Sequence, residues 1–293
     1  MKKLMLAAAA IAAGVAVADV TSANVVGYAN DGLSAGKWKP VCSQFIKIGT
    51  DGAEMKLKDL VPNLDGGTTS WQKGDAIKVM NTAGGVDFQA KYRGKWSDLS
   101  STEQKLFNEA TFVGGWYKCD KTMFANLTAE CANDTLVPFG SAVLAKSTKT
   151  AASIGSNGEV YQSEDGYITI GFSAGKWLFV GNSTPINLTL KDFEPNLDGG
   201  TTSWQKGDTI KIFNTAGGVD FQAKYRGKWS DLSSTEQKLF NEATFVGGWY
   251  KCDKTMFANL TAECVNSTEV NAGCGFLAKS TKTAATIKFP TAL

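Results

Sequence analysis

The sequence predicts a mainly β protein made of two tandem modules, each a β-sandwich or an open barrel with one or two short helices. Three observations support this prediction. The second half of the chain repeats the first, and apolar and polar residues alternate along several short segments. Turn-forming and ring-bearing residues are also frequent, with 31 Gly, 8 Trp and 16 Phe among 293 residues. Alternation places successive side chains on opposite faces of a strand, and glycine supplies the turns between strands.

The N-terminus predicts a secretory signal peptide over residues 1–18. Lys2 and Lys3 precede an apolar run over residues 4–17, and Ala16-Val17-Ala18 forms a small-x-small cleavage site. The run is shorter than the ~20 apolar residues that a membrane-spanning helix needs. No later stretch is apolar enough to span a membrane. We therefore expect a secreted protein that is extracellular, bound to the cell surface or periplasmic.

An internal repeat defines the two modules. At an offset of 133 residues, the segment 81–131 is identical to the segment 214–264. Further upstream the offset becomes 139, which aligns residues 34–38 with residues 173–177 and leaves six extra residues in the first copy. A repeat of this length indicates two tandem domains, because the units of a solenoid run to roughly 20 to 50 residues.

The boundary between the modules is expected near residues 155–162. Gly155-Ser156-Asn157-Gly158 has the composition of an exposed turn. The predicted organisation is therefore a signal peptide over 1–18, a first β module over 19–158 and a second over 159–293.

Each module is expected to contain a β-hairpin. Ile77 and Val79 alternate with polar or small neighbours, and after the connection 81–85 the apolar series Val86, Phe88, Ala90, Tyr92 alternates with the polar series Asp87, Gln89, Lys91, Arg93. This pattern predicts two strands with one buried and one solvated face. Further strands are expected over 25–29, 37–46, 115–120, 127–131 and 141–146.

Two short helical segments are expected in the first module. Ser100 followed by Glu103 has the spacing of a capping box, and an apolar stripe of Leu99, Leu106, Phe107 and Ala110 extends the predicted helix over 100–110. Residues 57–61 are expected to form another short turn of helix before Pro62.

The six cysteines predict disulfide bonds, because an exported protein meets an oxidising environment. Cys119 and Cys131 recur as Cys252 and Cys264, and we expect the bonds Cys119–Cys131 and Cys252–Cys264 between flanking strands. No metal or other cofactor is expected, because the chain has no His and no Cys-x-x-Cys motif.

The remaining cysteines, Cys42 and Cys274, occupy non-equivalent positions in the two copies. Cys42 aligns with Gly181, and Cys274 aligns with Ser141. Three states are open for them: a bond between the modules, a bond from one chain to the next, or two reduced thiols. A bond between chains would build a head-to-tail polymer.

Composition and charge exclude some classes of function and make others less favourable. Without histidine, the Ser-His-Asp and Cys-His catalytic groups cannot form. A pair of carboxylates could still catalyse hydrolysis, but the available ones, Asp87, Asp98, Glu103, Glu109 and Asp120, are expected on solvated faces and caps, so we do not expect an enzyme. Subtracting Lys2 and Lys3 from the 30 basic residues leaves 28, which equals the 28 acidic residues. This balance does not favour a nucleic-acid partner.

Four repeated tryptophans are the candidate ligand-binding residues. Trp96 and Trp116 recur as Trp229 and Trp249, and each has a glycine close by in the sequence. Flat rings on an exposed sheet face can stack on sugars, and two copies would increase avidity. The alternative is that these rings belong to the core, as most tryptophans of a β module do.

The chain also resembles a known group of proteins. The shared segments are 22–28 (Ser-Ala-Asn-Val-Val-Gly-Tyr), 35–38 (Ala-Gly-Lys-Trp), 60–63 (Leu-Val-Pro-Asn), 67–69 (Gly-Thr-Thr), 136–140 (Leu-Val-Pro-Phe-Gly) and 158–160 (Gly-Glu-Val). They resemble a group of secreted, uncharacterised β-rich proteins of verrucomicrobial and related bacteria. The resemblance implies export and a repeated β fold, and it carries no catalytic residues. The helix at 100–110 and the extra cysteines depart from the group's pattern.

Two functions are consistent with these observations. The first is a secreted, non-enzymatic protein with a structural or adhesive role outside the cell or at its surface. The second is a glycan-binding protein that uses exposed aromatic side chains. The expected partners are glycans or other cell-envelope proteins, and self-association is possible through the unpaired cysteines.

Overall fold

The computed structural model describes residues 26–46, 54–64, 75–80, 86–122, 126–149, 151–197, 204, 207–214, 218–256 and 259–291. The predicted signal peptide and the hairpin connection at 81–85 lie outside these residues. Within them the chain is mainly β, as predicted, and consists of several antiparallel sheets with two short α-helices.

The described residues of the first half form three sheets. The largest has six strands in the order β2 (Trp38–Val41), β10 (Val143–Lys146), β5 (Ala76–Met80), β6 (Val86–Arg93), β7 (Gly115–Cys119) and β8 (Leu127–Cys131). A three-stranded sheet has the order β1 (Val26–Gly32), β11 (Ser153–Glu159), β4 (Val61–Pro62), and β3 (Glu54–Lys56) pairs with β9 (Leu136–Pro138). The predicted hairpin is present as the antiparallel pair β5–β6.

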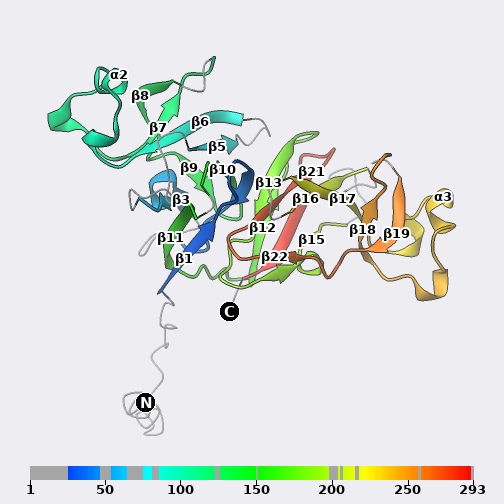
Figure 1. Ribbon diagram of the computed structural model, residues 1–293. Helices are drawn as coiled ribbons and strands as arrows, with labels where there is room; N and C mark the ends of the chain where they lie inside the picture. The colour runs from blue at the N-terminus through cyan, green and yellow to red at the C-terminus, as the bar shows by residue number, and fades with distance from the viewer. Residues whose placement is uncertain are drawn as a thin grey trace, which may run out of the picture.

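The second half repeats this arrangement strand for strand. Its six-stranded sheet has the order β13 (Trp177–Gly181), β21 (Gly275–Lys279), β16 (Thr209–Phe213), β17 (Val219–Arg226), β18 (Gly248–Cys252) and β19 (Leu260–Cys264). The three-stranded sheet has the order β12 (Tyr167–Gly171), β22 (Thr286–Pro290), β15 (Glu194–Pro195), and β14 (Leu188–Thr189) pairs with β20 (Glu269–Val270). Figure 1 shows the two halves side by side.

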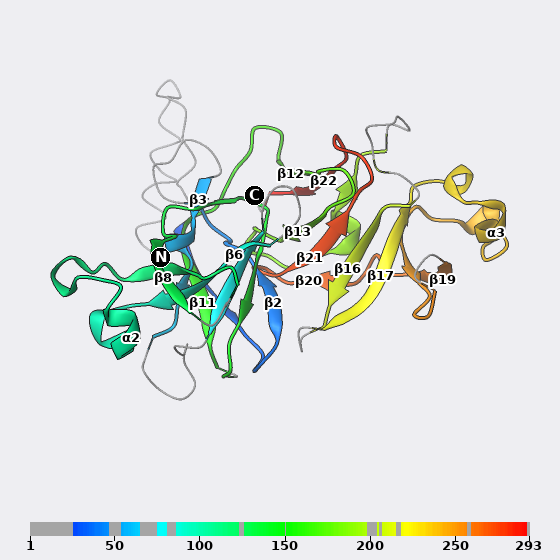
Figure 2. The same cartoon turned by 90° about the horizontal axis from the view of Figure 1, so that it is seen from above.

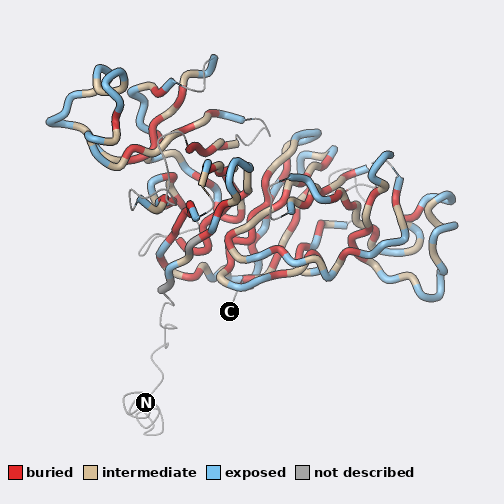
Figure 3. Tube along the Cα trace, viewed as in Figure 1, coloured by how far each residue is buried: buried red, intermediate tan, exposed pale blue. Residues whose placement is uncertain are grey.

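Each half has a hydrophobic core between its large and its small sheet, and the core of the second half also includes Ile46 and Phe139 of the first half. In the first half, Ile77, Ala90 and Ala145 of the large sheet pack in one cluster with Ile154 of the small sheet. All four side chains are at most 1% exposed. Figure 3 shows the buried residues concentrated along these strands. Burial of apolar side chains from both sheets is the main stabilising contribution to a fold of this kind.

Helical structure is shorter than the sequence predicts. Ser100 accepts a hydrogen bond from the Glu103 backbone, and the Glu103 side chain accepts one in return, so the predicted capping box is present. The α-helix itself, α2 (Ser101–Gln104), nevertheless ends after one turn and is followed by a separate 3-10 turn, η3 (Glu109–Thr111). Of the predicted apolar stripe, Leu99 and Phe107 pack in one cluster, whereas Leu106 and Ala110 are exposed. The predicted turn before Pro62 is present as the 3-10 turn η1 (Leu57–Asp59).

The predicted exposed turn at residues 155–158 is wrong. These residues lie inside β11, which pairs with β1 along its whole length. The glycine at 158 serves close packing instead: a Cβ at this position would lie 1.9 Å from the carbonyl oxygen of Ile46. A glycine-rich segment thus marks a close approach of two backbones rather than a turn.

Two equivalent β-bridges join the two halves. Val41 forms a β-bridge with Cys274, and Val180 forms one with Ser141. Val180 is the repeat equivalent of Val41, and Ser141 is the equivalent of Cys274. Exchanging the two modules therefore converts one contact into the other, which means that a local twofold axis relates them.

Candidate functional sites

Each module carries a projecting lobe between two strands of its large sheet. We call residues 94–114, between β6 and β7, the first lobe, and residues 227–247, between β17 and β18, the second lobe. Their sequences are identical. Figures 1 and 2 show α2 and α3 (Ser234–Gln237), which belong to these lobes, at opposite ends of the molecule.

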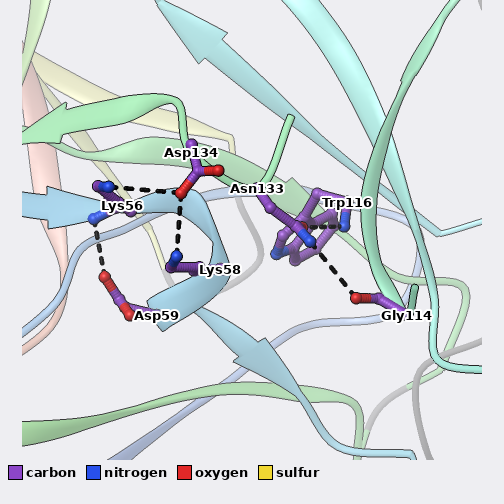
Figure 4. A network of polar contacts seen from close by, with 7 residues as sticks. All are labelled: Lys56, Lys58, Asp59, Gly114, Trp116, Asn133 and Asp134. Atoms are coloured by element: carbon purple, nitrogen blue, oxygen red, sulfur yellow. Dashed lines mark hydrogen bonds and ion pairs between the residues drawn. The ribbon is translucent and has the colours of Figure 1, made fainter. Parts of the chain in front are cut away.

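A close backbone contact closes the base of each lobe. In the first lobe, a Cβ added to Gly114 would lie 2.2 Å from the carbonyl oxygen of Gly94. Asn133 lies against the same place, since its side chain accepts from the Trp116 backbone at 2.8 Å and donates to the Gly114 carbonyl at 3.4 Å. Figure 4 shows these contacts. The adjacent Asp134 accepts hydrogen bonds from Lys56 and Lys58, at 3.4 and 2.9 Å.

An aromatic cluster fills the first lobe. The Phe107 ring lies edge-on to Phe112 and Tyr117, with centroids 5.4 and 4.8 Å apart. Trp96 packs edge-on against Phe112 at 5.9 Å. Tyr117 is buried, and its hydroxyl donates to the Val113 carbonyl. The Phe112 and Tyr117 rings are stacked with centroids 5.6 Å apart, so the cluster combines the two arrangements that aromatic pairs prefer.

A buried ion pair connects the lobe to the sheet. Arg93 at the end of β6 donates to Glu103 of α2 at 2.5 Å, and the two side chains are 3% and 15% exposed. Burial raises the pKa of the Glu103 carboxyl, but hydrogen bonds from Arg93 and Ser100 outweigh it and hold that pKa below its ordinary value. Arg93 was predicted on the solvated face of the hairpin, and this is wrong because the lobe folds back over it.

Two of the four tryptophans predicted to bind a ligand lie in the core. Trp116 and Trp249 are fully buried, and their indole N–H groups donate to the carbonyls of Leu60 and Phe193. The prediction that these two rings face a ligand is therefore wrong: the glycines beside them serve the close contact at the lobe base. Trp96 and its equivalent Trp229 lie in the lobes and are partly exposed.

Two further exposed-face tryptophans were missed by sequence reasoning. Trp38 lies beside Lys78 and Lys146, whose amines are 4.4 and 5.7 Å from the ring centre. Trp177 repeats this arrangement in the second module, with Lys211 and Lys279 at 4.3 and 5.8 Å. The signal was present in the sequence, since the Ala-Gly-Lys-Trp segment ending at each ring occurs in both copies.

The candidate carboxylates do not form one catalytic group. Asp98 accepts from the backbones of Gly94 and Lys95, and Glu103 is engaged by Arg93, so both shape the lobe. Asp87 and Asp120 line a separate surface cavity of about 470 Å³ beside Lys118. Glu109 is exposed on the first lobe. Among the described residues, no group of three or more Cys, Asp or Glu side chains is placed to bind a metal ion.

The predicted bonds Cys119–Cys131 and Cys252–Cys264 are not formed, and all six cysteines are free thiols. The strands pair in a register that separates the cysteines: Cys131 lies opposite Tyr117, and Cys119 lies opposite Leu127. The second copy has the same register, with Cys264 opposite Tyr250 and Cys252 opposite Leu260. Spacing along the chain could not reveal this, because an irregularity in the ladder sets the register.

A cavity with a mixed polar and apolar lining lies at one contact between the modules. It has a volume of about 350 Å³, and its lining includes Lys39, Cys274 and Glu269. The neighbouring Asp31 is 9% exposed. Burial raises the pKa of Asp31 from 3.8 to about 6, against opposing contributions from Lys39 and Gln44.

The fold and these sites define a class of protein. The chain is a two-module antiparallel β protein with a duplicated aromatic lobe at each end. No protein-family model, curated protein or solved structure matches it. In the part of the chain that the structure describes, no helix is both long and apolar enough to span a membrane.

Proposed function

We propose that this protein is a secreted, non-enzymatic adhesion protein that uses its two identical lobes to join two partners at the cell surface. The observation that carries the proposal is the position of the lobes: two surfaces of the same sequence project from opposite ends of one molecule. A molecule with two identical binding ends can bridge two ligands or engage one repetitive surface with high avidity.

The pattern of differences between the copies supports a role for the lobes. Core positions differ, for example Leu60 against Phe193 and Val143 against Phe276, whereas every residue of the lobes is the same. Connecting segments normally vary more than the elements they join. The identical segment 81–131 contains the lobe together with β6, β7 and β8, so this whole part of each module is conserved between the copies, as a shared binding task would require.

The surface of the lobes has the chemistry of a contact site. Leu106 and Val113 are 44% and 64% exposed in the first lobe, and Leu239 and Val246 repeat these values in the second. Exposed apolar side chains beside fixed aromatic rings are typical of protein-binding surfaces. This favours a partner protein of the cell envelope as the ligand.

The experiment compares binding to a single partner with bridging between two partners. Leu106→Ser with Val113→Ser disables the first lobe, and Leu239→Ser with Val246→Ser disables the second. Each variant should still bind isolated cell envelopes but should no longer agglutinate envelope-coated beads, and the variant with both lobes changed should do neither. Tyr28→Ser, at a residue 72% exposed outside the lobes, is the matched control. Agglutination by either single-lobe variant at the wild-type level would contradict the proposal.

A second candidate function is glycan binding through Trp96 and Trp229. The observation in its favour is that both rings are partly exposed and are held edge-on by Phe112 and Phe245, each at 5.9 Å. Trp96→Ala with Trp229→Ala should abolish retention on immobilised cell-surface polysaccharide if the rings stack on sugars. Unchanged retention, with the lobes still folded by NMR, would eliminate this candidate.

A further inference from the structure

Two clusters of aromatic and basic side chains lie on the outer faces of the large sheets, away from the cores. We call Trp38, Lys78 and Lys146 the first Trp–Lys site, and Trp177, Lys211 and Lys279 the second. In the first site Trp38 lies opposite Lys146, and Lys78 lies opposite Leu144, two residues before Lys146. The inward-facing neighbours Ile77 and Ala145 are fully buried, whereas the residues of both sites are partly exposed.

The lysines of these sites differ from the other lysines that lie over aromatic rings. Among the described residues, Lys118 lies over Phe88, Lys251 over Phe221 and Lys288 over Tyr167. Each of these three amines also forms an ion pair, with Glu130, Glu263 and Glu194 respectively. No described carboxylate forms an ion pair with the four lysines of the Trp–Lys sites. The indole rings attract these four charges but do not neutralise them.

The two copies keep the Trp–Lys sites where the sequence around them has diverged. The six residues lie outside the identical segments 81–131 and 214–264, yet each tryptophan and each lysine recurs. On the same strands, Pro40 is replaced by Phe179, Ala76 by Thr209 and Met80 by Phe213. The distances from amine to ring centre agree as well, at 4.4 and 5.7 Å in the first site and 4.3 and 5.8 Å in the second. A repeated arrangement that survives changes beside it indicates a shared role.

The two sites adjoin across the junction between the modules. Met80 and Leu144 of the first outer face pack in one apolar cluster with Phe179, Phe213 and Leu277 of the second. Leu144 is two residues from Lys146 along β10, and Leu277 is two residues from Lys279 along β21. One site therefore lies on each side of this cluster. A polymer that contacts both sites would bind more tightly than a ligand of either site alone.

We propose that the two Trp–Lys sites bind an acidic polysaccharide, a chain that contains uronic-acid sugars. The indole ring packs against the apolar face of a sugar ring, and the sugar carboxylates supply the counter-ions that the lysine amines lack. A neutral glycan would leave the amines without counter-ions, and a small anion would not use the ring. Nucleic acid is a poorer fit, because the 30 basic and 28 acidic residues of the chain nearly balance. This site is separate from the lobes, so it is a function in addition to adhesion.

Binding of polygalacturonate to the full mature chain, measured by isothermal titration calorimetry, tests the proposal. One variant combines Lys78→Gln, Lys146→Gln, Lys211→Gln and Lys279→Gln, which removes four charges and keeps polar side chains. Its affinity should be about 100-fold lower than that of the wild type, because both sites lose their counter-charges and the avidity is lost with them. Arginine at the same four positions should retain binding, since it keeps the charge and also stacks on aromatic rings. Higher ionic strength should weaken binding of the wild type.

Lys118→Gln with Lys251→Gln is the matched control, because these lysines also lie over rings but already have carboxylate partners. This control, the variant with both lobes changed and the variant with Trp96→Ala and Trp229→Ala should all bind polygalacturonate like the wild type. The result is therefore independent of the adhesion assay. Circular dichroism verifies that each variant is folded.

Four results would overturn the proposal. They are failure of the wild type to bind polygalacturonate, unchanged binding by the variant without the four lysines, an equal loss in the matched control, and equally tight binding of a different polymer. The different polymers are dextran, which is a neutral polysaccharide, and single-stranded DNA, which would assign the sites to nucleic acid.

Discussion

Replacing Glu103 by glutamine removes the negative charge that faces Arg93 and keeps the size of the side chain. Arg93 is 3% exposed and Glu103 is 15% exposed, so the guanidinium would be left nearly buried without its counter-ion. Breaking a fully buried pair costs about 3 to 5 kcal/mol. Some water reaches Glu103, and glutamine still accepts one neutral hydrogen bond, so we expect a loss of about 2 kcal/mol in the local stability of the first lobe.

Amide hydrogen exchange measured by NMR checks this value. A loss of about 2 kcal/mol corresponds to a roughly 30-fold decrease in the protection of amides in the first lobe. The second lobe serves as an internal reference, because Arg226 and Glu236 form the same pair at 2.5 Å in an identical sequence. NMR gives separate signals for the two lobes. Mass spectrometry could not separate them, because their peptides have identical masses. Glu236→Gln should reverse the result, lowering protection in the second lobe only.

The effect should also depend on pH in a defined direction. The pKa of Glu103 in the folded protein lies below its ordinary value of 4.5, so its ionised form stabilises the lobe above that value. This stabilisation is lost as the pH falls through the folded-state pKa, and the wild type and Glu103→Gln should then converge. A protection change of less than threefold at neutral pH, or an equal loss in both lobes, would refute the reasoning.

Three further substitutions test the rest of the structure. Trp116→Phe leaves the buried Leu60 carbonyl without its donor and opens a cavity, so chemical denaturation should show a loss of about 3 kcal/mol in the free energy of unfolding. Gly114→Ala places a Cβ 2.2 Å from the Gly94 carbonyl oxygen and should loosen the lobe base by about 1 to 3 kcal/mol, measured by exchange of lobe amides. Asp31→Asn should stabilise the protein at pH 7 by up to about 3 kcal/mol. The pKa of Asp31 is raised from 3.8 to about 6 in the folded protein, so the wild type loses stability as the pH rises from the first value to the second. The melting temperature of this variant should change less with pH across that range than the melting temperature of the wild type. An equal change in both proteins would contradict the assignment.

The strands could be predicted wherever one face is buried and the other is solvated. The predicted strand 127–131 coincides with β8, and the alternation at Ile77 and Val79 correctly marks buried positions. The duplication itself was evident from the sequence and is matched by the equivalent strand orders of the two halves. The strands depend on local patterns that repeat with a period of two, whereas the duplication depends on sequence identity alone.

The candidate sites were predicted less well, because they depend on contacts between distant segments. The burial of Arg93 and of Trp116 follows from how the lobe and η1 pack on the sheet, which no local pattern encodes. The capping box at Ser100 was found, but the helix ends after one turn and the chain continues into the 3-10 turn η3. Cys42 and Cys274 are more than 200 residues apart, and only the tertiary fold brings them to one contact.

The local twofold axis that relates the two modules has a consequence for assembly. Paired contacts of this type are what an isologous homodimer presents, with the same patch used by both partners. In this protein one polypeptide supplies both partners, so the association holds at any protein concentration. A module expressed alone would expose the backbone groups that Val41 or Val180 now shares with its neighbour. We therefore expect an isolated module to assemble with a second copy of itself, at a midpoint that shifts with dilution.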